Sequence, residues 1–534
     1  MAHRRAAGAC HATDAFGGLS RRYDDRFVGS VRDEVHPTRD YSRDFGERNL
    51  YRQPYVITSM ARWVGLWLVL LLLGSARAEE SYLGLFVNDQ RIGFVSSLTQ
   101  NETIGGKTLI RTDSTTVIQA GLLGDALSLR IYSQSWNDAK GNPQLMKFSV
   151  ESGGRSQRTE ATFTETQIHV VIDNNGAITS KKVSIPKDAK VVDDAVNSLL
   201  EDGVIAGSER VYYVLDPMTS TLIKNTARLA GPRKVTVRGK DFDATLIEVV
   251  EPRATTKVYV SAKGDLIKAE ALAGISMIPI SKEEALSDAP ANARIDLATM
   301  TKIPVDKPLG DLDGLARVNL SFVGANLSRA PSDLHQTIKG SNKNWNVDLH
   351  PAVADPKIAV SIAKAAKQKP EWLKPGLNIP SGSSQFKTLA KRVVGGAPNV
   401  VEGANRIQKH VHGLMRPNAG IGVLRDASEV LKTKEGVCRD YAILTATLLR
   451  AANIPARLAS GLVYQAGDFY YHAWAEYWDG KRWLGLDSTR PSGKVTAGHL
   501  KLADGSVEEA FLFTFLESPQ VQVLNVKRKA GATR

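Results

Sequence analysis

Cys438 stands where a cysteine can become a nucleophile. Gly436 breaks the helix predicted to start at Asp426, and the run CRDYAILTATLLRAA places apolar residues at helical spacing until Asn453-Ile454-Pro455 ends it. A thiol in the first turn of a helix lies at the positive end of the helix dipole, beside backbone N–H groups that lack a helical partner. Both features favour the thiolate, which is the reactive form, and the same N–H groups can stabilise an oxyanion.

A histidine and an aspartate follow at spacings that could complete a catalytic triad. The segment FYYHAWAEYW, which contains His472, alternates as a β-strand, and a second strand is predicted to end at Asp487. The dipeptide Asp479-Gly480 between them is typical of a two-residue hairpin turn. If the loop contains only those two residues, His472 lies directly opposite Asp487, with Cβ atoms about 4.5–5.5 Å apart. This register therefore predicts contact between the imidazole and the carboxylate.

These three side chains could together perform acyl transfer. The aspartate would fix the tautomer of the histidine and stabilise its imidazolium, and the histidine would accept the thiol proton and later protonate the leaving group. Taken singly, each residue has a simpler interpretation: Cys438 as a small buried side chain, His472 as a packed strand residue and Asp487 as a strand end. The joint spacing of all three favours the catalytic interpretation.

The sequence around these residues resembles the transglutaminase-like superfamily. GVCRDYAILTATLLRAANIPARLASG is similar to the nucleophile region of that family, and HAWAEYWDGKRWLGLDSTRP is similar to its histidine and aspartate strands. The resemblance is close from Asp426 to Pro491 and looser from Ser381 to Pro519. Ser488 departs from the family pattern, which often has proline there. The resemblance implies a papain-like core with a catalytic triad of Cys438, His472 and Asp487.

The resemblance also implies a bacterial-type enzyme that acts on protein or peptide amides through a thioester intermediate. An amine acceptor would give transamidation, and water would give deamidation or proteolysis. The sequence leaves both open, because the triad fixes only the acyl-enzyme step and water exclusion decides the rest. The alternative is a non-catalytic binding module at the cell envelope that keeps a relict triad. The oligomeric state and any calcium dependence are equally open.

Other polar residues have weaker claims to a functional site. Asp440 is expected to be structural, capping its helix or pairing with Arg439. His410 and His412 are two residues apart on a predicted helix and do not share a face, so they make a poor metal pair, and His499 is isolated. No cysteine cluster, HExxH motif, phosphate-binding loop or dinucleotide motif is present, so we expect neither a metal nor another cofactor.

The segment from Met60 to Ala78 has the pattern of a secretory signal peptide. One arginine precedes an apolar run that is too short to span a membrane stably, and the final Ala-Arg-Ala is a typical cleavage site. Cleavage after Ala78 predicts a periplasmic or secreted protein. Residues 1–59, which include Cys10, would then be a non-native or disordered extension, and the mature chain would keep a single cysteine.

The whole sequence predicts an α+β protein, with a β-rich N-terminal part and a C-terminal papain-like core of helices packed on an antiparallel sheet. One helix is expected near residues 193–200, within alternating segments that predict strands. The formal net charge of +13 is spread along the chain, so nucleic acid is not an expected partner. The predicted parts are an extension at 1–59, a signal peptide at 60–78, a β-rich domain of unknown role at 79–285, a linker with a small β-rich segment at 286–380, the catalytic domain at 381–520 and a basic tail at 521–534.

Overall fold

The computed structural model describes residues 79–530, with several short gaps. The predicted N-terminal extension with Cys10, and the predicted signal peptide with its cleavage after Ala78, lie outside the described residues. None of the described helices is long and apolar enough to cross a membrane. The gaps are residues 88, 123–124, 175, 204, 252–253, 272–273, 288–301, 356–358, 422–423 and 512–518.

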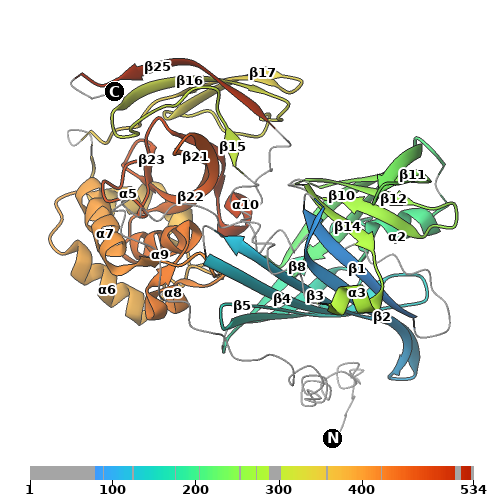
Figure 1. Ribbon diagram of the computed structural model, residues 1–534. Helices are drawn as coiled ribbons and strands as arrows, with labels where there is room; N and C mark the ends of the chain where they lie inside the picture. Colours follow the sequence, from blue (N-terminus) through green and yellow to red (C-terminus); the bar gives the residue numbers. More distant parts are fainter. Residues whose placement is uncertain are drawn as a thin grey trace, which may run out of the picture. The chain divides into compact units, whose positions relative to one another are not determined.

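The N-terminal part forms one extended antiparallel sheet, drawn from blue to green in Figure 1. Within the described residues it has 14 strands in the order β8-β7-β6-β5-β4-β3-β2-β1-β14-β13-β12-β11-β10-β9. Consecutive strands are therefore sheet neighbours, except that β8 and β9 lie at opposite edges, and the two halves join where β1 pairs with β14. The strands are β1 (Glu79–Val87), β2 (Gln90–Ile104), β3 (Lys107–Leu122), β4 (Asp125–Asn137), β5 (Pro143–Ser152), β6 (Arg155–Phe163), β7 (Gln167–Asn174), β8 (Ala177–Ser184), β9 (Glu209–Asp216), β10 (Thr221–Val237), β11 (Lys240–Val250), β12 (Thr255–Val260), β13 (Leu266–Glu270) and β14 (Ile275–Pro279).

Alternating apolar residues explain why these segments form strands. In β7 every second residue from Ile168 to Ile172 is buried, which is the period of a strand with one face in the core. The helix expected near residues 193–200 is α2 (Ala195–Glu201), and the side chain of Asp194 caps it by accepting N–H groups of its first turn. The apolar face of α2 packs into the core of the sheet. The predicted β-rich N-terminal part is therefore confirmed.

A smaller four-stranded sheet joins distant parts of the chain, in the order β17-β18-β16-β25. Within the predicted basic tail at 521–534, the residues up to Arg528 belong to strand β25 (Gln520–Arg528), which pairs with β16. Val521 and Val523 are buried, so apolar alternation outweighs basic composition here, and residues 531–534 lie outside the described residues. The other strands of this sheet are β16 (Leu315–Val323), β17 (Gln336–Ser341) and β18 (Asn344–Leu349).

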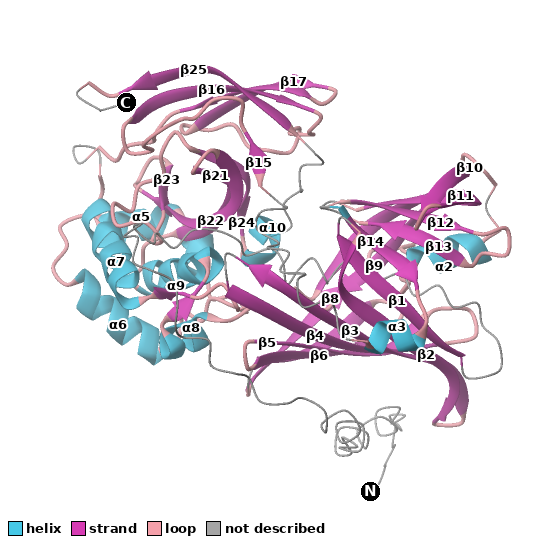
Figure 2. Cartoon of the chain, viewed as in Figure 1, coloured by secondary structure: helices cyan, strands magenta, loops and turns pink. Residues whose placement is uncertain are grey.

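In the C-terminal part, helices pack against a separate sheet with the order β15-β22-β21-β24, as Figure 2 shows for the helices labelled α5 to α9. Helix α9 is buried along nearly all of its length and shares one hydrophobic core with α6 and α7. This confirms the predicted α+β class. Residues 109–534 belong to one compact unit, so the domain boundaries proposed from the sequence stay predictions. The elements are α5 (Ile362–Gln368), α6 (Ser384–Val394), α7 (Val400–Leu414), α8 (Ala427–Thr433), α9 (Cys438–Ala451), α10 (Val507–Phe511), β15 (Ile303–Pro304), β19 (Arg416–Pro417), β20 (Glu435–Gly436), β21 (Ala456–Gln465), β22 (Asp468–Trp478), β23 (Trp483–Leu486) and β24 (His499–Gly505).

Candidate active site

Helix α9 starts at Cys438, as the sequence predicts, and this residue is only 3% exposed. In the first turn, Oδ2 of Asp440 accepts the backbone N–H of Val437 at 3.0 Å. The same carboxylate forms an ion pair with the buried Arg425 at 3.0 Å, and a longer one with Arg439 at 3.8 Å. Asp440 is therefore structural, as expected. It holds the residue before the cysteine in place, and its closer ionic partner is Arg425.

His472 and Asp487 meet in the structure, but not in the predicted register. Trp478 pairs with Trp483 where β22 joins β23, so the loop contains residues 479–482 instead of two residues. The carboxylate of Asp479 accepts the backbone N–H groups of the last two loop residues, which stabilises this longer turn. A change of two residues keeps each side chain on its face, so the contact survives as a diagonal one. Nε2 of His472 lies 2.9 Å from Oδ2 of Asp487.

The charges of these residues stabilise one another in a buried site. Burial alone would lower the pKa of His472, but the charges of Asp487 and Cys438, with hydrogen bonds to both, raise it to about 10. Burial also opposes ionisation of Asp487, yet the charge and hydrogen bond of His472 hold the pKa of its carboxyl well below the usual range. Because Asp487 engages Nε2, Nδ1 is the nitrogen that can exchange a proton with Cys438. The arrangement suits a thiolate–imidazolium pair.

A second histidine contacts the same carboxylate. Nε2 of His499, the first residue of β24, lies 3.4 Å from Oδ2 of Asp487. Its Nδ1 accepts the backbone N–H of Thr496 at 3.1 Å, so the neutral ring carries its proton on Nε2 and donates it to Asp487. Burial lowers the pKa of His499 to about 4, which keeps the ring neutral near pH 7. The expectation that His499 is isolated is therefore wrong. The pairing of β24 with β21 brings it to the site, and no local sequence signal announces that pairing.

The carboxylate of Asp487 is held by donors on both of its oxygens. Oδ1 accepts the N–H of Thr489 at 3.0 Å and its hydroxyl at 2.7 Å, while Oδ2 accepts from the two imidazoles. Ser488, where the family pattern often has proline, shares a hydrogen bond of 2.7 Å with Thr445 of α9. Its carbonyl lies 3.1 Å from Nδ1 of His412 on α7. These contacts fasten the end of the strand to two helices.

His472, Asp487 and His499 also have the spacing of a metal site, since their ligand atoms lie within 4.8 Å of one another. Two imidazoles and a carboxylate would suit zinc or iron. However, Oδ2 of Asp487 already accepts both imidazole N–H groups, so a metal ion would have to displace two hydrogen bonds and two protons. The hydrogen-bonded arrangement supports acid–base chemistry here.

Replacing His499 by phenylalanine is expected to lower kcat/KM of the acyl transfer that the sequence predicts by about tenfold. A hydrogen bond to a charged acceptor contributes roughly 1.5–3 kcal/mol, and a contact of 3.4 Å lies at the weak end of that range. His499→Gln can keep an N–H donor and should retain more activity. The measurement is kcat/KM beside the control His169→Phe, a substitution on β7. Native kcat/KM in His499→Phe would show that Asp487 does not need this donor.

Two comparisons of the sequence with known proteins found similar proteins. Residues 387–488 match the family described as the Transglutaminase-like superfamily. A segment of 70 residues is 41% identical to a protein-glutamine gamma-glutamyltransferase of Pseudomonas aeruginosa. That segment makes up 11% of this chain and 10% of the relative, so the chain spans about a tenth of the length of this curated protein.

Solved structures with some likeness include the periplasmic domain of TgpA from Pseudomonas aeruginosa bound to ethylmercury. It is 17% identical with a TM-score of 0.22, over 35% of this chain and 88% of that one. A beta-barrel-like protein from Brucella abortus is 9% identical with a TM-score of 0.29, over 38% of this chain and 96% of that one. On the sequence match, residues 387–488 of this chain form a transglutaminase-like superfamily domain, distantly homologous to a protein-glutamine gamma-glutamyltransferase.

Proposed function

We propose that this protein is a cysteine-dependent enzyme that transfers acyl groups from protein or peptide amides through a thioester on Cys438. The observation that carries the proposal is the buried pair of His472 and Asp487, whose imidazole is also coupled to the thiol at the start of α9. The family match over residues 387–488 supports the same class of chemistry.

In the acylation step, the thiolate of Cys438 attacks the carbonyl carbon of the bound amide. The oxyanion that forms can be stabilised by backbone N–H groups at the start of α9. As the C–N bond breaks, the imidazolium of His472 gives its proton to the departing nitrogen, which leaves as ammonia or an amine. Asp487 keeps the imidazole oriented and stabilises its positive charge throughout.

In the second step, neutral His472 accepts a proton from the acceptor as it attacks the thioester carbonyl. An amine acceptor gives a new amide, and water gives a carboxylic acid; in both cases the Cys438 thiolate is released and the imidazolium is restored. The two outcomes share the acylation step and differ in access of water to the thioester. We therefore propose acyl transfer as the common chemistry, with transamidation and hydrolysis as the two outcomes to be separated by assay.

We also propose that the enzyme acts in the periplasm or outside the cell. The support for this is the signal-peptide pattern at residues 60–78. A mass measurement of the native N-terminus should find a chain that begins at Glu79. A chain that still contains the apolar segment would contradict the proposed processing.

Thiol alkylation across pH tests the acylation machinery. The purified protein is treated with iodoacetamide, and the peptide that contains Cys438 is quantified by mass spectrometry, apart from Cys10. We expect Cys438 to react below pH 7 faster than free cysteine, because the imidazolium of His472 stabilises the thiolate. His472→Ala should lose this low-pH reaction, and the control His169→Ala should keep it. If Cys438 of the native protein reacts no faster than free cysteine below pH 7, the proposal that the protein is an enzyme is wrong.

The acceptor is identified by a second assay on the same preparations. A glutamine-containing protein is incubated with a labelled primary amine, and amine incorporation, ammonia release and peptide cleavage are measured together. Incorporation in excess of hydrolysis indicates transamidation, and ammonia or cleavage products without incorporation indicate hydrolysis. Cys438→Ala should abolish whichever signal the native protein gives.

A further inference from the structure

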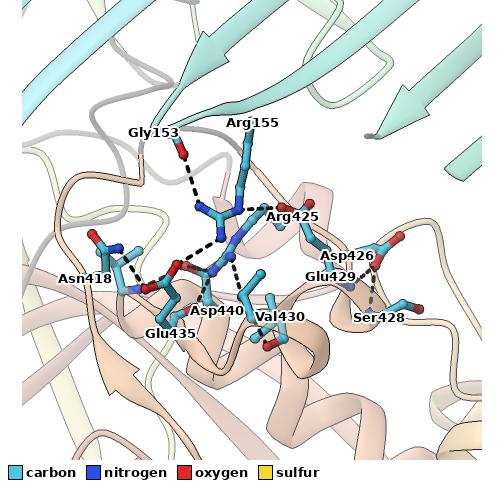
Figure 3. Close-up of polar contacts among 12 residues, drawn as sticks. Gly153, Arg155, Asn418, Arg425, Asp426, Ser428, Glu429, Val430, Glu435 and Asp440 are labelled. Atoms are coloured by element: carbon cyan, nitrogen blue, oxygen red, sulfur yellow. Dashed lines mark hydrogen bonds and ion pairs between the residues drawn. The ribbon is translucent and has the colours of Figure 1, made fainter. Parts of the chain in front are cut away.

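A group of charged side chains links the N-terminal sheet to the segment that precedes the nucleophile (Figure 3). Arg155 begins β6, and its Nε lies 2.7 Å from Oε1 of Glu429 on α8. Its Nη2 lies 2.9 Å from Oε1 of Glu435 in β20. The side chains of Arg155 and Glu429 are 13% and 14% exposed, so this ion pair is shielded from water more than surface pairs are, whereas the Glu435 side chain is 35% exposed. One arginine of the sheet thus neutralises two carboxylates of the C-terminal part.

A second contact fixes the same segment to the sheet without using charge. Ala419 and Ile421, which follow β19, are buried in the hydrophobic core of the N-terminal sheet. The hydroxyl of Ser152, at the end of β5, donates to the carbonyl of Gly420 at 3.3 Å. Because β19 pairs with β20, the sheet supports both strands of the pair that leads to Cys438.

Buried hydrogen bonds continue from Glu435 to the nucleophile. The backbone carbonyl of Glu435 accepts from Arg425 at 2.6 Å, and Arg425 pairs with Asp440 at 3.0 Å. The side chains of Arg425 and Asp440 are fully buried, and Asp440 accepts the N–H of Val437, the residue before Cys438. A displacement of Glu435 would therefore disturb groups that have no water to replace their lost partners.

Arg155 also compensates negative charge on the segment that leads to Cys438. Glu435 precedes Cys438 by three residues, and hydrogen bonds from Asn418 and Arg155 hold the pKa of its carboxyl below the usual value. This carboxylate is therefore ionised at neutral pH. Burial raises the pKa of Glu429, and the positive charges of Arg425 and Arg155 oppose that rise. Without Arg155, the negative charge of Glu435 would lose its cationic partner just before α9, and that charge would oppose formation of the thiolate.

We propose that Arg155 is a positioning residue for the nucleophile, which anchors the segment before α9 through Glu429 and Glu435 and neutralises the Glu435 carboxylate, whose charge would otherwise disfavour the Cys438 thiolate. The proposal rests on the proposed function, because it concerns the same thiol. In this proposal the N-terminal sheet supports the active site, because Arg155 belongs to strand β6.

The other charged or titratable residues around the start of α9 are not substituted in any of the variants described below. They come from α9 itself, from the segment before α8, and from the strands and loops that carry the histidines and the aspartate. These groups are Arg439, Asp440, Arg425, His472, Asp487 and His499. The test changes only Arg155 and its two carboxylate partners, so a change in pH dependence is assigned to them.

The test measures alkylation of Cys438 by iodoacetamide at pH 6 and pH 9, again by mass spectrometry. Arg155→Met is expected to react about tenfold more slowly than the native protein at pH 6, and within about twofold at pH 9, where the thiolate forms without assistance. The matched control is Arg158→Met on the same strand. Arg158 is half exposed and lies 3.8 Å from Asp173, and its variant should react like the native protein.

Restoring the charge balance separates electrostatics from general damage. A triple variant, Arg155→Met with Glu429→Gln and Glu435→Gln, lacks the uncompensated carboxylates. Its rate at pH 6 should return to within about threefold of native. Arg155→Lys keeps a positive charge, so its alkylation rate at pH 6 should lie between those of the native protein and Arg155→Met. This variant replaces Arg155→Met in the comparison if the methionine variant does not fold.

Two results would overturn the electrostatic role of Arg155: a native rate for Arg155→Met at pH 6, or a triple variant that stays as slow as Arg155→Met. These differ from failure of the proposed function. In that case Cys438 of the native protein itself would react like free cysteine at pH 6, and both proposals would fall together.

Discussion

Replacing Asp487 by asparagine is expected to slow acyl transfer by about ten-thousand-fold without unfolding the protein. The carboxylate of Asp487 only accepts hydrogen bonds, so it keeps the proton of His472 on Nε2 and leaves Nδ1 to act on Cys438. An asparagine amide has the same shape but can donate to Nε2, which moves the imidazole proton to Nδ1 and removes the base. The measurement is kcat/KM for amine incorporation or hydrolysis.

A matched control and a pH profile distinguish this effect from structural damage. Asp468→Asn lies on the same strand as His472, where Asp468 pairs with Lys302 at 2.8 Å, and this variant should keep native activity. In Asp487→Asn the pKa of His472 should fall from about 10 toward its ordinary value, because the charge of Asp487 is a main cause of the increase. The imidazolium is then lost at lower pH. A native kcat/KM in Asp487→Asn would rule out the triad.

The contact between His472 and Asp487 could be predicted from the sequence even though the register was wrong. Alternation along a strand fixes the face of each side chain, and only an odd shift moves a side chain to the other face. The expected loop of two residues and the actual loop at 479–482 differ by two. The prediction of contact therefore survives, while the direct opposition becomes a diagonal approach of 2.9 Å. The predicted turn is two residues too short, because the Asp479 carboxylate accepts the backbone N–H groups of Lys481 and Arg482 and so stabilises a longer loop.

The rest of the site depends on contacts between distant segments, which local patterns do not encode. His499 reaches Asp487 because β24 pairs with β21, and Arg155 reaches Glu435 from a different sheet. Periodicity identifies a strand but not its partner, so neither contact had a signal in the sequence. The position of Cys438 at the start of a helix could be predicted, because neighbouring residues in the sequence determine where that helix begins.

Replacing Lys501 by methionine is expected to destabilise the protein by about 3–5 kcal/mol. The Lys501 side chain is 1% exposed, and its ammonium group contacts Asp333 at 2.5 Å, Glu476 at 2.7 Å and Asp504 at 3.0 Å. Methionine fills a similar volume but removes the cation from Asp333, and it leaves Glu476 and Asp504 with Arg457 as their cationic partner. The free energy of unfolding in urea at pH 7 measures the loss. The control is Lys494→Met, because Lys494 is exposed.

The pH dependence of this loss separates charge from packing. Burial would raise the pKa of Asp333, but Lys501 lowers it, so this stabilisation is present above the ordinary value of 3.8 and is lost as pH falls. Burial opposes protonation of Lys501, but Glu476 and the other carboxylates raise its pKa, so its contribution is complete below 10.5 and is lost as pH rises further. The difference between native and Lys501→Met should therefore be constant from neutrality down to about pH 4 and shrink only as pH falls below 3.8. A difference that persists unchanged at about pH 3 would assign the loss to packing of the lysine stem. A variant within about 1 kcal/mol of the Lys494→Met control would show that water reaches the carboxylates.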